Sequence, residues 1–405
     1  MANVSSSNGL EKRPKLRFPG FDEPYRTTPL GEIASLVNRT DPKSNAPIMM
    51  LSAGNGFIMQ SEKYSRDNAG QSLKKYILLK QGELAYNHGA SKAKQFGCCY
   101  ELTEPEARIP YVYHCFKIND HEYTPFIAMA LNNAKMDKQL KRLVSSSVRM
   151  DGLLNISFED YMSVTLHLPS STEQKHIADF LKKIDERIAA QEKLLASLKK
   201  YKRGLLMHYF SDDKTQLWTQ CSVSQIGKVI TGSTPPTNDR SNYDGDLLFC
   251  APGDVGEQKY ISSTEKRVSP KGFALGRPLP PNSVIVTCIG LIGKLGIAKT
   301  SMITNQQINA LVVSEGFDHE FIYYAFENFF PEYRSKVSMQ TLPILSKSEF
   351  EKLMIKVPDL DVQHKISSHL AAMDRRIEHT QQELNARRIM QQGLSVEQYF
   401  QFTGL

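Results

Sequence analysis

One stretch of this sequence occurs twice. LPSSTEQKHIADFLKKIDERI, residues 168–188, returns at a constant offset of 189 residues as VPDLDVQHKISSHLAAMDRRI, residues 357–377. The matched pairs are Pro169 with Pro358, Gln174 with Gln363, Ile177 with Ile366, Leu181 with Leu370, Asp185 with Asp374, Arg187 with Arg376, Ile188 with Ile377, Leu195 with Leu384 and Gly204 with Gly393. A repeat this long, without a gap, indicates that one unit was duplicated within the chain.

Each copy has the pattern of a long amphipathic helix. Apolar residues recur at steps of three and four, which is the spacing of a heptad seam. They are Ile177, Leu181, Ile184, Ile188, Leu195, Leu198 and Leu205 in the first copy, and Ile366, Leu370, Met373, Ile377, Leu384 and Leu394 in the second. Polar residues interrupt the seam at Gln191, Lys202, Thr380, Arg387 and Gln391. We expect the two helices to pack together with polar positions fixing their register, the alternative being that each lies on its own domain's core.

The ends of the first helix are also predicted. Ser171 and Gln174 have the spacing of a capping box, and Gly204 is expected to end or weaken the helix. A helix from Thr172 to Arg203 would be about 48 Å long.

The repeat reaches beyond the helices. Residues 153–169 and 342–358 both end in an alternating strand that leads into a proline, and residues 29–42 resemble 225–236. The predicted organisation is head, helix, head, helix, with a pseudo-two-fold internal repeat. Its parts are a flexible N-terminal tail (1–24), a first head (25–168), a first helical spacer (169–213), a second head (214–357) and a second helical spacer (358–405).

Both heads are predicted to be α+β domains with a small twisted sheet. In the second head, short β-branched runs at 283–290, 294–300 and 309–314 indicate strands, and 318–337 indicates an aromatic-rich helix. The first head shows strands within 74–87 and a helix near Pro125–Leu143. The heads agree far less than the helices do, which indicates that the helices share one task while the heads recognise different targets.

Polar, basic and aromatic residues gather in loops of both heads. Lysine, arginine, asparagine and glutamine side chains there could contact bases or phosphates, although a solvated surface is the plainer reading of any single loop. The candidate DNA-binding residues are Lys63, Arg66, Asn87 and Lys92 in the first head and Asn238, Arg240, Lys259, Gln306 and Gln307 in the second.

Composition narrows the class of protein. A net charge of +7 mildly favours a polyanionic partner. The six cysteines form no CxxC pair and the ten histidines show no metal-ligand spacing, so no metal site is expected. The longest apolar run, near 284–292, is too short to cross a bilayer, and the N-terminus lacks the apolar segment of a secretory signal, so we expect a cytoplasmic protein.

Together these segments resemble the specificity subunit of a type I restriction-modification system. The resemblance rests on 14–33 (PKLRFPGFDEPYRTTPLGEI), GSTPPT (232–237), 284–298 (VIVTCIGLIGKLGIA), TNQQINAL (304–311) and the repeated helices. It implies two target recognition domains that each read half of a bipartite DNA site, held apart by an antiparallel coiled coil. It further implies a prokaryotic complex with two modification subunits and restriction subunits, no cofactor in this chain, and S-adenosylmethionine on the modification subunits.

The first head departs from the family pattern. It has no clear counterpart of TNQQINAL or of TCIGLIGKLGIA, and EARIPYVYHCFKI (106–118) occupies that place.

No catalytic signature is evident. TPPT (234–237) is not the loop with which adenine methyltransferases hold a flipped base, and GLIGKLG (290–296) lacks the Ser or Thr of a P-loop and is predicted to be a turn between strands. The favoured interpretation is a non-catalytic DNA-recognition subunit. The alternatives are a coiled-coil scaffold whose heads bind protein and, more remotely, a self-contained methyltransferase.

Overall fold

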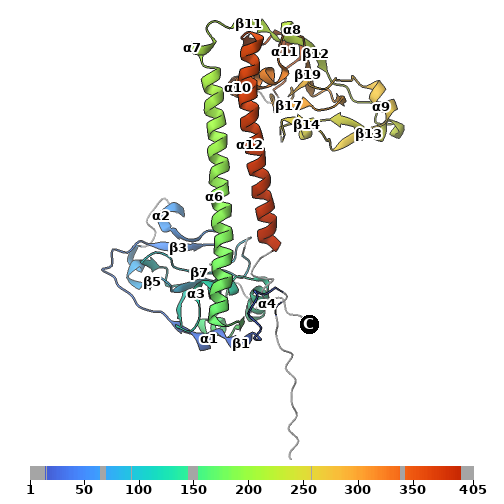
Figure 1. The fold of residues 1–405 in the computed structure, drawn as a ribbon. Helices are drawn as coiled ribbons and strands as arrows, with labels where there is room; N and C mark the ends of the chain where they lie inside the picture. The colour runs from blue at the N-terminus through green and yellow to red at the C-terminus, as the bar shows by residue number, and fades with distance from the viewer. Residues whose placement is uncertain are drawn as a thin grey trace, which may run out of the picture. The chain divides into compact units, whose positions relative to one another are not determined.

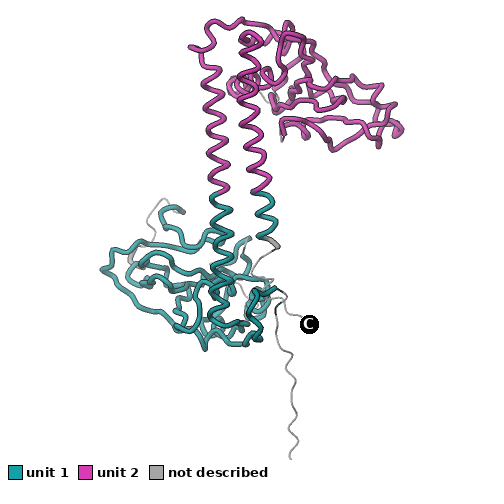
Figure 2. The backbone as a smooth tube through the Cα atoms, in the orientation of Figure 1, with its two compact units in different colours: residues 1–190, 384–405 teal, residues 191–383 magenta. Residues whose placement is uncertain are grey.

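The chain forms two compact units, which are described separately (Figure 2). Unit 1 comprises residues 1–190 and 384–405, and unit 2 comprises 191–383. The computed structural model describes residues 14, 16–63, 70–92, 94–144, 154–256, 258–337 and 343–393. Each unit contains one head and parts of both long helices, α6 (Ser171–Tyr209) and α12 (Leu360–Gly393) (Figure 1).

The head of unit 1 is built on a four-stranded antiparallel sheet in the order β2-β9-β6-β7. Its strands are β1 (Arg26–Pro29), β2 (Ala34–Leu36), β3 (Met49–Ser52), β4 (Gly56–Met59), β5 (Ile77–Lys80), β6 (Leu84–Asn87), β7 (Cys98–Glu101), β8 (Glu106–Ile109), β9 (His114–Ile118) and β10 (Thr165–Leu168). Its helices are α1 (Leu30–Ile33), α2 (Gln60–Lys63), η1 (Gly70–Lys75), α3 (Thr124–Ala130), α4 (Ala134–Leu143) and α5 (Phe158–Met162).

The head of unit 2 has a five-stranded sheet, β12-β19-β16-β17-β14, and a three-stranded sheet, β15-β13-β18. Its strands are β11 (Thr219–Ser222), β12 (Gly227–Thr231), β13 (Tyr243–Cys250), β14 (Tyr260–Ile261), β15 (Lys266–Val268), β16 (Val284–Thr287), β17 (Leu295–Ala298), β18 (Met302–Thr304), β19 (Ile308–Val313) and β20 (Met354–Val357). Its helices are α7 (Asp212–Thr215), α8 (Val223–Ile226), η2 (Arg240–Asn242), η3 (Pro252–Asp254), α9 (Pro270–Leu275), α10 (His319–Val337) and α11 (Lys347–Lys352).

The two heads follow the same plan. In each, the strand that enters the head pairs with the strand that leads into a long helix: β1 with β10, and β11 with β20. The main sheets correspond strand by strand, with β2, β9, β6 and β7 matching β12, β19, β16 and β17. Strand β9 is formed by the last five residues of EARIPYVYHCFKI, and it is the counterpart of β19. Strand β19 begins with the residues IN of TNQQINAL.

Several local predictions are confirmed and others are corrected. The strands and the aromatic helix expected in the second head are β16, β17, β19 and α10. The helix expected at 125–143 is two helices, because Asn133 accepts hydrogen bonds from the amides of Lys135 and Met136 and starts α4 anew. The tail was expected to extend to residue 24, but the guanidinium of Arg17 makes two hydrogen bonds to Glu173, at 3.0 and 2.8 Å, so the part described from residue 16 belongs to unit 1.

The first long helix begins and ends differently from the prediction. Its N-cap is Ser170, one residue before the predicted Ser171, and Asp359 caps α12 at the equivalent position of the repeat. Gly204 does not end α6, which continues to Tyr209. A methyl group at Gly204 would touch nothing within 4 Å, whereas Leu206, two residues on, packs into the core of unit 2, and this packing outweighs the weak helix propensity of glycine.

The first three turns of each long helix belong to a head. Ile177 and Leu181 are buried in the main core of unit 1, and Ile366 and Leu370 are buried in the main core of unit 2. For these turns the alternative interpretation, a helix on its own domain's core, is the correct one.

Further along, α6 and α12 contact each other through the polar residues that interrupt the seam. In unit 2, Gln191 Nε2 donates to Glu383 Oε2 at 2.7 Å, Lys202 Nζ lies 2.7 Å from Asp374 Oδ1, and the hydroxyl of Tyr209 lies 2.6 Å from His369 Nδ1. As the residue number rises on α6 it falls on α12, so the two segments are antiparallel in this unit.

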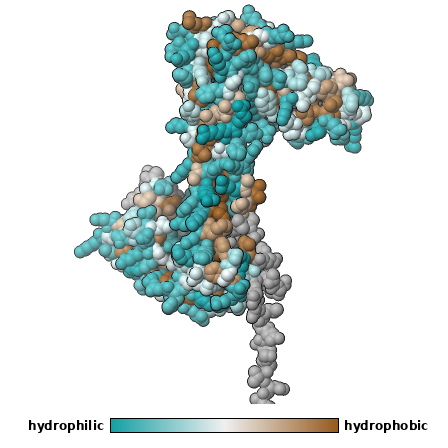
Figure 3. Space-filling view, in the orientation of Figure 1, coloured by the Kyte–Doolittle hydropathy of each residue, from teal (hydrophilic) through white to brown (hydrophobic). Residues whose placement is uncertain are grey.

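On the face shown in Figure 3, each unit is mostly hydrophilic with separate apolar spots. No helix among the described residues is long and apolar enough to cross a membrane.

The repeated glutamines explain why the helix repeat begins with Pro-x-x-x-x-Gln. Gln174 is fully buried, donates to the carbonyl of Pro169 at 3.0 Å and accepts from the amide of Tyr123, which precedes α3. Gln363 donates to the carbonyl of Pro358 at 2.9 Å and accepts from the amide of Asp318, which precedes α10. In each unit one buried side-chain amide therefore joins three elements: the end of strand β10 or β20, the long helix that follows it and a helix of the head.

We expect Gln363→Ala to destabilise unit 2 by about 1–3 kcal/mol, because the amide N–H of Asp318 and the carbonyl of Pro358, both on half-buried residues, lose their partner together. Urea unfolding followed by the fluorescence of Trp218, the single tryptophan, measures this. Gln382→Ala, at an exposed position of the same helix, is the control and should change stability by less than about 0.5 kcal/mol. Equal effects of the two variants would show that the buried amide contributes nothing special.

Candidate nucleic-acid interface

Two loops of unit 2 that are far apart in sequence lie against each other. The amide of Gly232 donates to Ile308 O at 3.0 Å, and the amide of Ser233 donates to Thr304 O at 2.8 Å. The hydroxyl of Thr234 donates to Gln306 Oε1 at 2.7 Å. The segments GSTPPT and TNQQIN thus form one surface, and we call residues 232–243 with 304–309 the head-2 loop cluster.

Gly232 makes this approach possible. A Cβ at this position would lie 2.1 Å from Asn305 O and 2.3 Å from Thr304 Oγ1, distances that no side chain tolerates. Glycine is used where one backbone must pass close to another, and here it brings the two loops together.

The rest of the cluster is held by hydrogen bonds to the two prolines. Tyr243 OH donates to Pro235 O at 2.6 Å, and Asn242 Nδ2 donates to Pro236 O at 3.1 Å. Between them, Asp239 caps the short helix η2 by accepting from the amide of Ser241. The backbone that carries Asn238 and Arg240 is therefore fixed on both sides.

Arg240 is an available positive charge in this cluster. Its side chain is exposed, and no described carboxylate forms an ion pair with it. The neighbouring carboxylate of Asp239 is engaged instead by Lys271 Nζ at 2.7 Å. Hydrogen bonds from Lys271 and Ser241 lower the pKa of Asp239 to about 2, and the ionised Asp239 is paired with Lys271 rather than with Arg240.

The other predicted residues of the second head differ in availability. Asn238 and Gln306 are exposed, whereas Gln307 is half-buried and accepts from Asn305 Nδ2 at 3.1 Å. Lys259 lies outside the cluster; its amine pairs with Glu320, donates to Tyr324 OH at 2.9 Å and sits over the Tyr324 ring at 4.5 Å. A DNA contact by Lys259 would have to compete with these partners.

Three buried polar atoms of the cluster have no hydrogen-bond partner. They are Ser233 Oγ, Asn242 Oδ1 and Thr304 Oγ1. Unsatisfied buried polar atoms are rare in native proteins, and several in one loop cluster indicate a surface that is completed by a ligand or water. Sequence reasoning singled out the loops that carry these residues but not the residues themselves.

In the first head, the loop after β6 is tightly built. Asn87 Oδ1 accepts from the amide of Gly89 at 2.9 Å, and Ser91 and Lys94 bond to each other across the loop. Lys92 is exposed at its tip. Lys63 ends α2, its side chain lies outside the described part of the structure, and Arg66 lies outside the described residues.

The profile of the type I restriction modification DNA specificity domain matches residues 74–200 and 216–386, well over half of the chain. The chain belongs to this family. Its two matches fall on the two copies of the repeat, so each unit supplies one specificity domain.

Two relatives are specificity subunits of type I restriction enzymes. The MjaIX subunit of Methanocaldococcus jannaschii is 30% identical over 40% of this chain and 39% of its own length. The HindI subunit of Haemophilus influenzae is 29% identical over 26% of this chain and 24% of its own length. The chain thus matches about two-fifths and a quarter of these two relatives.

Solved structures share the fold. An S subunit of a type I restriction-modification system from M. genitalium matches with a TM-score of 0.63 at 13% identity, over 97% of this chain and 100% of that chain. A chain from a study of complex assembly and conformational transition of the type I R-M system matches with a TM-score of 0.53 at 16% identity, over 95% and 99%.

The described part of the chain contains no group of three or more His, Cys, Asp or Glu residues that could hold a metal ion. GLIGKLG forms the turn between the antiparallel strands β16 and β17, as predicted, with Gly290 and Gly293 at φ +72° and +76°.

We expect Gly232→Ala to separate the two loops of the head-2 loop cluster. A methyl group 2.1 Å from a backbone oxygen must move one loop, at a cost of about 1–3 kcal/mol in unfolding free energy. Urea unfolding followed by Trp218 fluorescence again provides the measurement. Gly253→Ala, where a methyl group would meet nothing within 4 Å, is the matched control.

Proposed function

We propose that this protein is the DNA-recognition subunit of a type I restriction-modification complex and that each head reads one half of an asymmetric, bipartite DNA site. The observation that carries this proposal is the head-2 loop cluster: exposed Asn238, Arg240 and Gln306 stand on a rigid surface within a domain that matches the DNA specificity family. Arginine, asparagine and glutamine are the side chains that bond bidentately to guanine and adenine edges in the major groove.

The two half-sites are proposed to differ in sequence. The main sheets of the heads share one strand order, but the loops that the shared strands carry differ in length and composition. The Arg240 helix of unit 2 follows β12, whereas residues 37–48, which follow the matching strand β2 in unit 1, contain no helix. Different side chains on one scaffold would read different bases.

The helices are proposed to form an antiparallel coiled coil that sets the distance between the half-sites. Support comes from two contacts at equivalent repeat positions: Lys202 with Asp374 at 2.7 Å in unit 2, and Gln391 with Asp185 at 2.5 Å in unit 1. Asp185 matches Asp374 and Lys202 matches Gln391 at the offset of 189, so each contact is the repeat image of the other. Pairs of this kind arise when two antiparallel helices are related by a pseudo-two-fold axis.

The same helices are proposed to dock two modification subunits, to which restriction subunits are added in the nuclease. Both helices expose large apolar side chains: Leu194, Tyr201 and Met207 on α6, and Ile389 and Met390 on α12. Exposed apolar side chains on a helix are typical of a surface that a partner covers. This chain is proposed to be non-catalytic and without a cofactor, and S-adenosylmethionine is assigned to the modification subunits.

We expect Arg240→Ala to relax recognition in the half-site read by the second head and to leave the other half-site unchanged. Loss of a bidentate base contact costs about 1–3 kcal/mol of discrimination, or about 5- to 150-fold in affinity. Mapping methylated adenines in cells carrying each variant gives the readout, with Lys299→Ala as an exposed control. Equal weakening of both half-sites would make Arg240 a phosphate contact instead, and loss of sequence dependence altogether would favour a protein-binding scaffold.

We expect one heptad inserted after Gln191, together with one inserted after Thr380, to lengthen the unread spacer. Seven helical residues add about 10 Å, the rise of about three base pairs. The methylated motif of the variant should therefore contain about three more unspecified base pairs. An unchanged spacer would refute the role of the helices as a gauge. Insertion of a heptad into α6 alone is the control, because it breaks the register between the two helices.

A further inference from the structure

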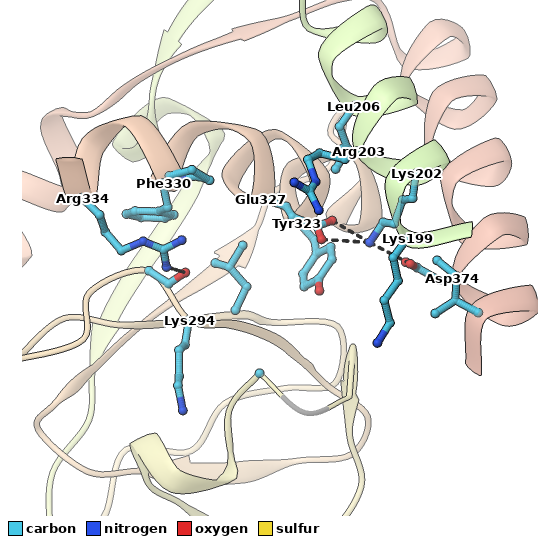
Figure 4. Close-up of a pocket in the computed structure, with 15 residues that line it drawn as sticks. Lys199, Lys202, Arg203, Leu206, Lys294, Tyr323, Glu327, Phe330, Arg334 and Asp374 are labelled. Atoms are coloured by element: carbon cyan, nitrogen blue, oxygen red, sulfur yellow. Dashed lines mark hydrogen bonds and ion pairs between the residues drawn. The ribbon is translucent and has the colours of Figure 1, made fainter. Parts of the chain in front are cut away.

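Unit 2 contains a basic cavity that the proposed function does not use. Its volume is about 540 Å³, and it lies between α6, α10, α12 and the β16–β17 turn (Figure 4). The lining includes the cations Lys199, Lys202, Arg203, Lys294 and Arg334 and the anions Glu327 and Asp374. Leu206, Tyr323, Phe330 and Ile377 contribute apolar wall.

Lys202 forms ion pairs with both carboxylates of the lining. Lys202 Nζ lies 2.9 Å from Glu327 and 2.7 Å from Asp374, and Asp374 also accepts from Tyr324 OH at 2.5 Å. Burial works to lower the pKa of Lys202, but the charges of Glu327 and Asp374 outweigh it and raise that pKa, so the lysine stays charged. Both carboxylates of the cavity wall are therefore paired with Lys202, and the five cations and two carboxylates of the lining leave a net positive charge of three.

The remaining four cations outnumber the one negative charge that the group of Lys202, Glu327 and Asp374 leaves over. Lys199 and Arg203 are exposed on α6, and Lys294 and Arg334 are half-buried. No described carboxylate forms an ion pair with any of them. Figure 4 shows Lys294 and Arg334 on one side of the cavity and Lys199, Lys202 and Arg203 on the other, so the positive charge surrounds the space.

The sequence brings one of these cations into place through the GLIGKLG turn. A Cβ at Gly293 would lie 2.4 Å from the ring of Phe330, so only glycine lets the turn press against α10. The guanidinium of Arg334 donates to the carbonyls of Ile292 and Gly293, at 3.4 Å each, and holds the turn there. Lys294 is the next residue, and it lines the cavity.

We propose that this cavity binds phosphate groups. Like charges held together in one recess repel one another, and a phosphate relieves that repulsion with two or more charges and several oxygen acceptors in a small volume. The planar guanidinium of Arg203 can meet such oxygens with two parallel N–H groups, and a cavity of this size admits a polyphosphate or a nucleotide-sized group. The phosphate belongs either to a duplex bound by the complex, which rests on the proposed function, or to a free phosphorylated ligand.

The test compares two triple variants of the full chain. The cavity variant is Lys199→Gln/Arg203→Gln/Lys294→Gln, which spares the bonded Lys202 and Arg334. The matched control is Lys214→Gln/Lys228→Gln/Lys299→Gln, which removes the same charge from exposed positions of unit 2 outside the cavity lining. Thermal unfolding followed by Trp218 fluorescence establishes that both fold.

The first arm measures duplex binding by the complex with its modification subunits as salt is varied. Each lost phosphate contact lowers the slope of log affinity against log salt by about 0.9, so a cavity on the DNA path predicts a fall of up to about 2.7. The fall should be equal for duplexes with and without the recognised sequence. The second arm titrates the chain alone with inorganic tripolyphosphate, for which the cavity variant should bind about tenfold more weakly or worse.

The outcomes separate the sources of phosphate. A lower salt slope in the cavity variant alone assigns the cavity to duplex phosphates, and an unchanged slope with lost tripolyphosphate binding assigns it to a free ligand. If the cavity variant and the control behave alike in both arms, the proposal is overturned. Failure of the wild-type complex to prefer any duplex would defeat the proposed function, while the tripolyphosphate arm would still decide the cavity.

Discussion

The burial of the first turns of each long helix in a head is the constraint on which the rest of the structure depends. Ile177 and Leu181 are part of one core, and Ile366 and Leu370 are part of the other. A helix that begins inside a hydrophobic core cannot pivot freely against it, because any rotation would expose apolar surface at about 25 cal/mol per Å². The strand pairs β1–β10 and β11–β20, together with the buried glutamines, fix the same junction with hydrogen bonds. Each head is therefore firmly attached to the long helix whose first turns it buries.

Beyond the heads, polar contacts join the two helices, while the seam residues Ile188, Leu195 and Leu384 stay buried. Gln191 bonds to Glu383, and Lys202 bonds to Asp374. An apolar seam alone permits sliding by a heptad, whereas a buried polar pair is satisfied in one register only. The residues that interrupt the heptad pattern can thus select the pairing, and the proposed role of the helices as a gauge requires such a selection.

Much of this could be predicted because duplication leaves a strong signal. The offset of 189 residues located both helices, and the strands that lead into the prolines were predicted, whereas their pairing with β1 and β11 was not. The N-cap of α6 was misplaced by one residue. The passage of α6 through Gly204 was missed, because it depends on tertiary contacts such as the packing of Leu206. The loop contacts of Gly232 were beyond prediction for a similar reason: a 2.1 Å approach to Asn305 O exists only once β12 and β19 are paired. Lys259 was predicted to contact DNA because the sequence shows its charge but cannot show that it pairs with Glu320.

The repeat also separates what the two units share from what each has alone. The contact of Lys202 with Asp374 has its image in Gln391 with Asp185, yet the image lacks the cation. At the offset of 189, Arg203 matches Gln392, so the second copy also lacks that guanidinium. Glu327, Lys294 and Arg334 belong to the second head, whose loops diverged from those of the first. A basic cavity whose cations come from α6 and the second head therefore cannot be explained by the shared task of holding two heads, since duplication would then have kept it in both units. Its charges are better explained by a ligand that only unit 2 binds.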